Sequence, residues 1–170
     1  MTINICIAGL GNVGSEVVRS LSINNNYINK KLDIKINIIG ISAKNKTKKR
    51  SFNIDEFNWY SNPEDLLELN NIDIFIELIG EEKGLSYELV KKALNKNINV
   101  ITANKALLSK HGNELFKIAE NNKILLLFEA AVCGGIPIIK ILKKSILFNK
   151  FNKISGILNG TTNFILTQME

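Results

Sequence analysis

The chain is poor in the residues that build disulfide frameworks and metal clusters. Its 170 residues include two cysteines and one histidine. Cys6 and Cys133 stand far apart in unrelated surroundings, so they form neither a disulfide framework nor the close pair of a metal site. This scarcity excludes the small disulfide-rich secreted class and favours a reducing compartment, so we expect a cytoplasmic protein.

Long apolar runs are also lacking. No run approaches the ~18 residues that a membrane helix needs, and the N-terminus enters a strand pattern without a basic leader. We therefore expect no membrane association and no targeting segment. With 45% apolar and 22% charged residues, the composition is that of a globular protein with room for one domain and the start of another.

The net charge of +6 comes from lysines scattered along the chain, with one cluster at Lys44–Arg50. No aromatic residues are interleaved with that cluster. Positive charge alone bears on solubility and non-specific binding, so we expect no nucleic-acid partner.

Strand and helix patterns alternate along the chain. Short, almost wholly apolar runs predict strands, and apolar residues at helical spacing predict helices. Expected strands cover residues 3–8, 34–41, 72–79, 98–102, 124–128 and 154–158; expected helices cover 13–21, 63–69, 86–94, 106–120 and 136–147. Strands that are apolar on both faces belong inside a parallel sheet. We expect an α/β fold of the Rossmann type, a doubly wound, mostly parallel sheet with helices on both faces.

Two polar stretches, Asn24–Lys31 and Lys44–Arg50, are expected to be surface loops. Residues 164–169 begin an amphipathic helix that stops at Glu170 without a C-cap glycine or a polar tail. We infer that the chain is a piece of a longer protein.

Gly9, Gly11 and Gly14 follow the spacing G-x-G-x-x-G between the first expected strand and helix. In this setting the pattern is a dinucleotide-binding fingerprint, although an ordinary strand-to-helix turn is the alternative. Gly9 permits the tight turn, Gly11 lets the backbone approach the pyrophosphate, and Gly14 permits close helix packing. The pattern predicts a nicotinamide dinucleotide cofactor and an oxidoreductase.

The end of the second strand indicates which dinucleotide is bound. NAD-specific proteins place a carboxylate there, whereas this chain has Ser42, Ala43 and Lys44. The basic residues that follow can neutralise a 2′-phosphate, and Arg50 has the best-shaped fork for it. We predict NADP as the cofactor, with NAD and a merely solvated basic loop as alternatives.

Two charged residues follow later strands, at the sheet edge where ligands bind. Lys105 stands in the first turn of a helix, where the dipole disfavours a cation, so we expect it to orient or polarise a substrate oxygen; a side chain that merely extends into water is the alternative. Glu129 ends an apolar strand before the glycine pair Gly134 and Gly135. Its carboxylate, with nearby carbonyls, can hold a hard cation or accept backbone N–H groups.

Two further polar features carry weaker hypotheses. Cys133 could act as a thioester-forming nucleophile, but the single histidine, His111, lies inside a helix and no other base is evident, so we expect a packing residue. Thr161 or Thr162 can cap the last helix.

Several motifs together closely resemble the homoserine dehydrogenase family over the whole chain. They are the glycine turn, Phe75–Gly80, Thr102–Leu108, Ala106–Gly112, Phe128–Pro137 and Ile157–Thr161. The resemblance implies interconversion of homoserine and aspartate semialdehyde by hydride transfer with NAD(P)H, a step of threonine and methionine synthesis.

The resemblance also implies site residues. Expected cofactor contacts are Gly9, Leu10, Gly11, Asn12, Val13, Gly14, Arg50, Thr102 and Lys105. Lys105 is expected beside the reacting centre as well. Glu129 with the carbonyls of Val132, Gly134 and Ile136 matches the family's monovalent cation site, usually sodium.

Family members continue beyond the equivalent of Glu170 into a substrate and dimerisation domain that carries a proton-donating lysine. We therefore expect residues 1–132 to form the NAD(P)-binding domain and residues 133–170 to start a second, α+β catalytic domain. The full protein should be a dimer that binds a small-molecule substrate, and this piece should bind cofactor without turnover. A nucleotide sensor without a reaction is the alternative, although a sensor has no need for Lys105 and Glu129.

Overall fold

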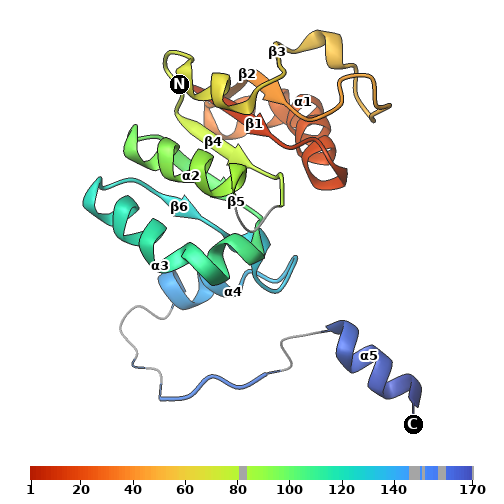
Figure 1. Ribbon diagram of the computed structural model, residues 1–170, viewed down its shortest axis with the longest axis vertical. Coiled ribbons are helices and arrows are strands. Elements are labelled where there is room, and N and C mark those ends of the chain that lie inside the picture. Colours follow the sequence, from red (N-terminus) through yellow and green to blue (C-terminus); the bar gives the residue numbers. More distant parts are fainter. Residues whose placement is uncertain (81–83, 146–149, 151, 157–159, 170) are drawn as a thin grey trace.

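A computed structural model describes residues 1–80, 84–145, 150, 152–156 and 160–169. Within this part of the chain, six strands form one wholly parallel sheet in the order β3-β2-β1-β4-β5-β6 (Figure 1). The strands are β1 (Thr2–Ala8), β2 (Lys35–Ser42), β3 (Trp59–Tyr60), β4 (Ile74–Glu77), β5 (Asn99–Thr102) and β6 (Leu126–Leu127). The order reverses between β1 and β4, so the predicted doubly wound Rossmann fold is confirmed.

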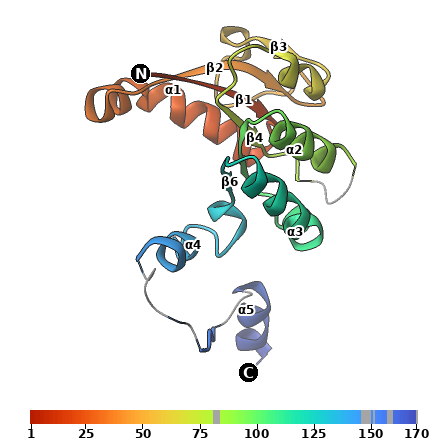
Figure 2. The ribbon, with the colours of Figure 1, turned by 90° about the vertical axis from the view of Figure 1, so that its left-hand side faces the viewer.

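Helices cover both faces of the sheet, as predicted (Figure 2). The main ones are α1 (Asn12–Leu32), α2 (Leu85–Asn95) and α3 (Lys105–Asn121); short 3-10 helices are η1 (Ile54–Glu56), η2 (Pro63–Glu68) and η3 (Glu129–Ala131). Successive strand residues face opposite sides of a sheet. Ile5 and Ile7 accordingly pack in the cluster under α1, whereas Cys6 and Ala8 pack in the cluster under η2, α2 and α3.

The structure corrects the prediction that Asn24–Lys31 is a surface loop. These residues form the second half of α1, which ends where Asp33 takes a left-handed conformation with φ 52°. The side chain of Asn25 makes two hydrogen bonds to the backbone of Ile36, as a donor at 2.7 Å and an acceptor at 3.1 Å. An asparagine that would favour a loop thus fastens the helix to β2.

The margins of the sheet differ from the prediction. Strand β3 was missed because only Trp59 and Tyr60 pair with β2. The expected strand at 124–128 is reduced to the two residues of β6, which form the last strand of the sheet. Leu126 is buried under α3, while Leu125 and Leu127 point to the opposite face and are 58% and 47% exposed.

The C-terminal part differs most from expectation. The helix expected at 136–147 is a short α4 (Ile138–Lys140) followed by a π-helical turn, Ile141–Ser145, and residues 146–147 lie outside the described part. The strand expected at 154–158 is wrong for 154–156, which have no regular structure, and its last two residues are not described.

The last predicted helix is confirmed as α5 (Gly160–Met169), which Figure 1 shows away from the sheet. Its first residue is Gly160, so Thr161 and Thr162 stand inside its first turn and are not its N-cap. No described helix is long and apolar enough to cross a membrane.

Candidate functional site

The glycine turn lies where the ends of three neighbouring strands meet. The Gly9 N–H donates to the carbonyl of Ser42 at 2.8 Å, and the Leu78 N–H donates to the carbonyl of Ala8 at 2.7 Å. Gly9 has φ +97°, and a Cβ there would overlap the backbone of Leu78 and Ile79. Both observations require glycine, and they match the predicted role of Gly9 in the tight turn.

The other two glycines differ in what surrounds them. A Cβ on Gly14 would overlap the carbonyl oxygen of Gly9, so only glycine lets α1 begin this close to the turn. A Cβ on Gly11 would meet nothing within 4 Å, and Gly11 caps α1 without a side-chain hydrogen bond. The first N–H groups of α1 therefore have no capping side chain, which leaves them available to an anion.

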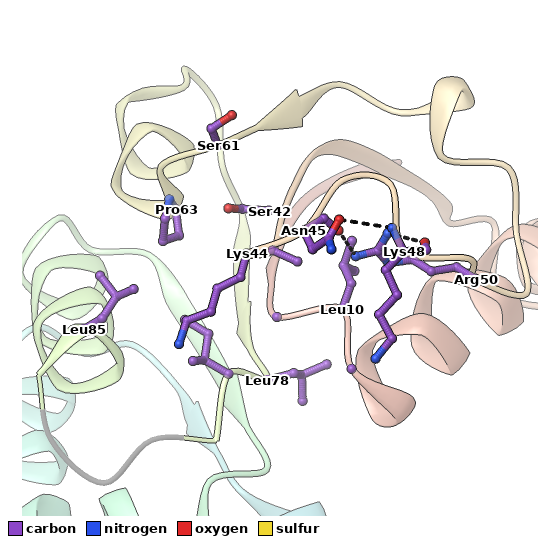
Figure 3. Close-up of a pocket in the computed structure, with 14 residues that line it drawn as sticks. Leu10, Ser42, Lys44, Asn45, Lys48, Arg50, Ser61, Pro63, Leu78 and Leu85 are labelled. Atoms are coloured by element: carbon purple, nitrogen blue, oxygen red, sulfur yellow. Dashed lines mark hydrogen bonds between the residues drawn. The ribbon is translucent and has the colours of Figure 1, made fainter.

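A cavity of about 410 Å³ opens beside this turn at the carboxyl edge of the sheet (Figure 3). Five segments form it: the glycine turn, the basic loop after β2, the segments that follow β3 and β4, and the start of α2. Its lining consists of Gly9, Leu10, Gly11, Ser42, Ala43, Lys44, Asn45, Lys48, Arg50, Ser61, Pro63, Leu78, Ile79 and Leu85. The position, between the outer ends of β1, β2 and β4, is where open α/β sheets bind ligands.

The cavity wall is basic and contains an unsatisfied hydroxyl. Ser42 is 1% exposed, and its Oγ has no hydrogen-bond partner within the described residues. Buried hydroxyls are nearly always paired, so this one fits a wall that a polar ligand completes. The charged lining residues are Lys44, Lys48 and Arg50, with no carboxylate among them.

Arg50 organises the basic loop from within, and the loop predicted at Lys44–Arg50 is confirmed. Its Nη1 donates to the carbonyls of Lys48 at 2.8 Å and Lys46 at 3.2 Å, and its Nη2 donates to the carbonyl of Asn45 at 2.6 Å. The guanidinium also lies 5.6 Å from the ring centre of Trp59. Among the described residues Nε alone of this guanidinium is buried without a partner, so much of the fork that was predicted to face a phosphate already binds the loop.

Lys105 is the first residue of α3, at the carboxyl end of β5, and its side chain is exposed. Asn104 caps the helix by accepting a hydrogen bond from the Leu107 N–H at 3.0 Å. Lys105 does not line the cavity, and neither do Asn12, Val13, Gly14 or Thr102. Their contacts with a cofactor stay predictions.

Glu77, at the end of β4, was not singled out from the sequence. Its side chain is fully buried, and each carboxylate oxygen accepts hydrogen bonds. Oε1 accepts from the Ile79 and Gly80 N–H groups at 2.9 and 3.3 Å and from Ser86 Oγ at 3.1 Å, and Oε2 accepts from Thr102 Oγ1 at 2.7 Å. The sequence signal is the carboxylate inside an apolar strand, which is costly to bury unless it is paired or hydrogen-bonded, as for Glu129.

Glu129 lies in η3 and binds backbone amides. Its Oε1 accepts from the Ile139 N–H and its Oε2 from the Lys140 N–H, each at 2.9 Å. This is the hydrogen-bonded alternative that the sequence left open. The described residues hold no group of three or more His, Cys, Asp or Glu side chains suited to a metal, but the predicted site needs only one carboxylate and three carbonyls.

The two cysteines occupy different settings. Burial raises the pKa of the Cys6 thiol to about 12, so Cys6 is a packing residue. Cys133 is exposed, so the expectation that it is a packing residue is wrong; it has φ +55°, next to Gly134 with φ +58°. Two successive left-handed residues turn the chain sharply after η3.

The turn, the uncapped helix start and the cavity at the strand-order reversal define a Rossmann-type dinucleotide-binding domain. Comparison with known families is more specific. A family model described as the NAD-binding domain of homoserine dehydrogenase matches residues 9–129, and a second model, described as homoserine dehydrogenase, matches residues 137–170. The chain belongs to the homoserine dehydrogenase family.

Individual relatives agree with this assignment. The chain is 38% identical to homoserine dehydrogenase of Neisseria gonorrhoeae and 41% identical to that of Helicobacter pylori, with 98% of the chain and 38% of each relative covered. A crystal structure of the Thiobacillus denitrificans enzyme matches with TM-score 0.84 at 35% identity, covering 99% of this chain and 39% of that one. The chain therefore spans less than half the length of these relatives.

A more distant structure is a mutant hyperthermophilic archaeal homoserine dehydrogenase in complex with NADPH. It matches with TM-score 0.81 at 27% identity, covering 99% of this chain and 56% of that one.

Proposed function

We propose that this chain is the cofactor-binding part of a homoserine dehydrogenase that interconverts L-homoserine and L-aspartate semialdehyde in threonine and methionine synthesis. The observation that carries the proposal is the cavity beside Gly9 and Gly11, in a chain whose family model covers residues 9–129. The nicotinamide supplies the hydride chemistry, and the protein supplies binding and orientation. We further propose a cytoplasmic dimer for the whole protein, acting on a small-molecule substrate.

The proposed cofactor is NADP, with NAD as the second candidate. No carboxylate follows β2 to bind a ribose hydroxyl, and the cavity wall carries Lys44, Lys48 and Arg50 instead. Arg50 shapes the loop through its three carbonyl contacts, and its buried Nε has no partner within the described residues. Lys48 extends from the same loop beside the turn (Figure 3). We therefore propose that the basic residues of this loop bind the 2′-phosphate together.

The first prediction concerns this choice of cofactor. NADPH should bind the chain more tightly than NADH in a fluorescence titration, because only NADPH carries the phosphate that the loop neutralises. Arg50→Ala should weaken NADPH binding by about tenfold or more, the value of a charged hydrogen bond. Lys117→Ala is the matched control, because it removes one exposed charge on α3 that does not line the cavity. Tighter binding of NADH, or NADPH affinity unchanged in Arg50→Ala, would contradict the assignment.

Lys105 is proposed to contact the cofactor and to orient or polarise the substrate oxygen beside the nicotinamide. Its place at the carboxyl end of β5 is on the ligand-binding edge of the sheet, and a cation at a helix start opposes the dipole unless another role retains it. Backbone contacts from Leu10, Asn12, Val13 and Thr102 to the cofactor are proposed with it.

We also propose that Glu129 and the carbonyls of Val132, Gly134 and Ile136 hold a monovalent cation, sodium by the family resemblance. The donor set is suitable, because a carboxylate oxygen that accepts one amide keeps a lone pair and the left-handed Cys133 and Gly134 redirect the chain. The Ile136 carbonyl also accepts the Ile138 N–H at 2.8 Å, which leaves it one lone pair.

The cation proposal is tested by thermal unfolding in sodium chloride against choline chloride at equal ionic strength. Sodium should raise the melting temperature of the wild-type chain and not of Glu129→Gln, because a ligand that binds only the folded state stabilises it. Glu120→Gln, an exposed change on α3, serves as the control. Equal stabilisation by choline would rule out a specific site.

A further inference from the structure

Glu77 joins the two halves of the proposed site, and we propose that it is a positioning residue that fixes Lys105 relative to the glycine turn. The inference rests on the proposed dinucleotide function. In the register of the sheet, Glu77 of β4 stands between Ala8 of β1 and Thr102 of β5.

The carboxylate of Glu77 is fully buried, so it is stable only if its oxygens are hydrogen-bonded. The four groups that donate to it belong to segments of the ligand-binding edge rather than to the core: the backbone after β4, the start of α2 and the end of β5. One side chain therefore holds three segments of that edge together.

Toward the cofactor, Glu77 acts through the backbone that follows it. The N–H groups of Ile79 and Gly80 donate to Oε1, which fixes the course of the chain directly after β4. The backbone of Leu78 and Ile79 lies against Gly9 so closely that a Cβ on Gly9 would overlap it. The same two residues line the cavity.

Toward Lys105, Glu77 acts through Thr102. The hydroxyl of Thr102 donates its one proton to Oε2 at 2.7 Å, which leaves a lone pair to accept the Asn104 N–H at 3.0 Å. Asn104 in turn caps α3 through the Leu107 N–H, and Lys105 is the first residue of that helix. The direction of the Thr102 proton, set by Glu77, thus determines how the start of α3 is held.

The test compares Thr102→Val, which removes the hydroxyl and keeps the shape, with Thr102→Ser, which keeps the hydroxyl. NADPH affinity is measured by titration of the 170-residue chain well below its melting temperature. Thr102→Val should weaken binding by about fivefold, whereas Thr102→Ser should stay within about twofold of wild type. Glu77→Gln should follow Thr102→Val, because its amide nitrogen cannot accept the hydroxyl proton.

A double-mutant cycle with Lys105→Ala separates positioning from general stability. If Thr102 acts through Lys105, Thr102→Val should lose most of its effect in the Lys105→Ala background. The NADPH affinities of Lys105→Ala and of the double variant should then agree within about twofold. Ile98→Val, a mild core change just before β5 at the end away from Thr102, should lower the melting temperature without altering affinity. A readout without cofactor is hydrogen exchange at the Leu107 amide, which should accelerate in Thr102→Val and not in Ile98→Val.

Three results would overturn the inference. The first is an additive cycle, in which Thr102→Val weakens binding equally with and without Lys105. The second is faster exchange at Leu107 with unchanged NADPH affinity, which would make the network structural only. The third is a wild-type chain that does not bind NADPH, which would overturn the proposed function as well; the first two leave that function intact.

Discussion

The glycines of the turn differ in whether the surrounding atoms leave room for a side chain. A methyl group on Gly14 would overlap the Gly9 carbonyl, whereas one on Gly11 would meet open space at a φ of −72° that alanine adopts. Gly14 is therefore needed for the fold, whereas we expect Gly11 to be needed only for binding of the cofactor.

We predict that Gly14→Ala lowers the free energy of unfolding by about 1 to 3 kcal/mol, the usual cost of overpacking, and weakens NADPH binding with it. Gly11→Ala should change stability by less than about 1 kcal/mol, because the space around it is open. It should still reduce NADPH affinity, because its new methyl group faces the predicted path of the pyrophosphate. Urea unfolding and titration of both variants make the comparison, and equal stability of the two would show that the close approach at Gly14 is dispensable.

Pairs of elements are joined by surface charge as well as by the core. Glu68, the last residue of η2, binds Lys92 of α2 and Lys96, the C-cap residue of that helix, each at 2.8 Å. Hydrogen bonds from these two lysines lower the pKa of the Glu68 carboxyl from 4.5 to about 2. Because the side chains are exposed, with Glu68 at 59%, the contribution to stability is small.

The direction in which the contribution of the Glu68 ion pairs changes with pH is nevertheless defined. A carboxyl whose pKa is lowered in the folded state stabilises the fold above its unfolded value and loses that contribution as pH falls. The melting temperature of the wild-type chain should therefore decline between pH 4.5 and about 2, and Glu68→Gln should decline less steeply. Glu120→Gln, on exposed α3 surface, should follow wild type. Parallel curves for wild type and Glu68→Gln would show that the ion pairs contribute nothing.

Elements with strong local patterns were predictable from the sequence, and those defined by neighbours were not. The apolar strands β1, β2, β4 and β5 and helices α2 and α3 were found, because their periodicity is local. Strand β3 was missed because two residues carry no pattern, and the length of α1 was missed because Asn25 takes its partner from β2. Neither the strand β3 nor the full length of α1 can be inferred from the local sequence.

The same distinction holds in the site. Its glycines, Lys105 and Glu129 could be singled out because each follows an expected strand. Ser61, Pro63 and Leu85 of the cavity could not, because only the folded chain brings them to the turn. Arg50 was chosen for its charge, but its bonds to loop carbonyls depend on a loop conformation that the sequence does not specify.

At the scale of the whole molecule, the chain corresponds to only part of the length of its relatives. The chain accounts for 38% of the length of its Neisseria gonorrhoeae relative. The family resemblance implies that the proton-donating lysine lies in the part of these relatives that this chain does not cover. This chain should therefore bind the cofactor without catalysing the reaction.

We predict that the 170-residue chain binds NADPH but does not oxidise homoserine at a measurable rate. The measurement is NADP reduction followed by absorbance, with the full-length Neisseria gonorrhoeae relative as the positive control under the same conditions. Measurable oxidation of homoserine by the isolated chain would mean that residues 1–170 hold a complete active site.

The two-residue strand β6 has a practical consequence for such experiments. Its outer edge pairs with no other described strand, and Leu127 in the strand and Leu125 just before it are half-exposed on the face opposite α3. An open, apolar sheet margin is a template on which further strands can add. Aggregation of the isolated chain at high concentration would thus start at β6, and a charged residue at position 127 is the change that would keep it in solution while leaving the glycine turn untouched.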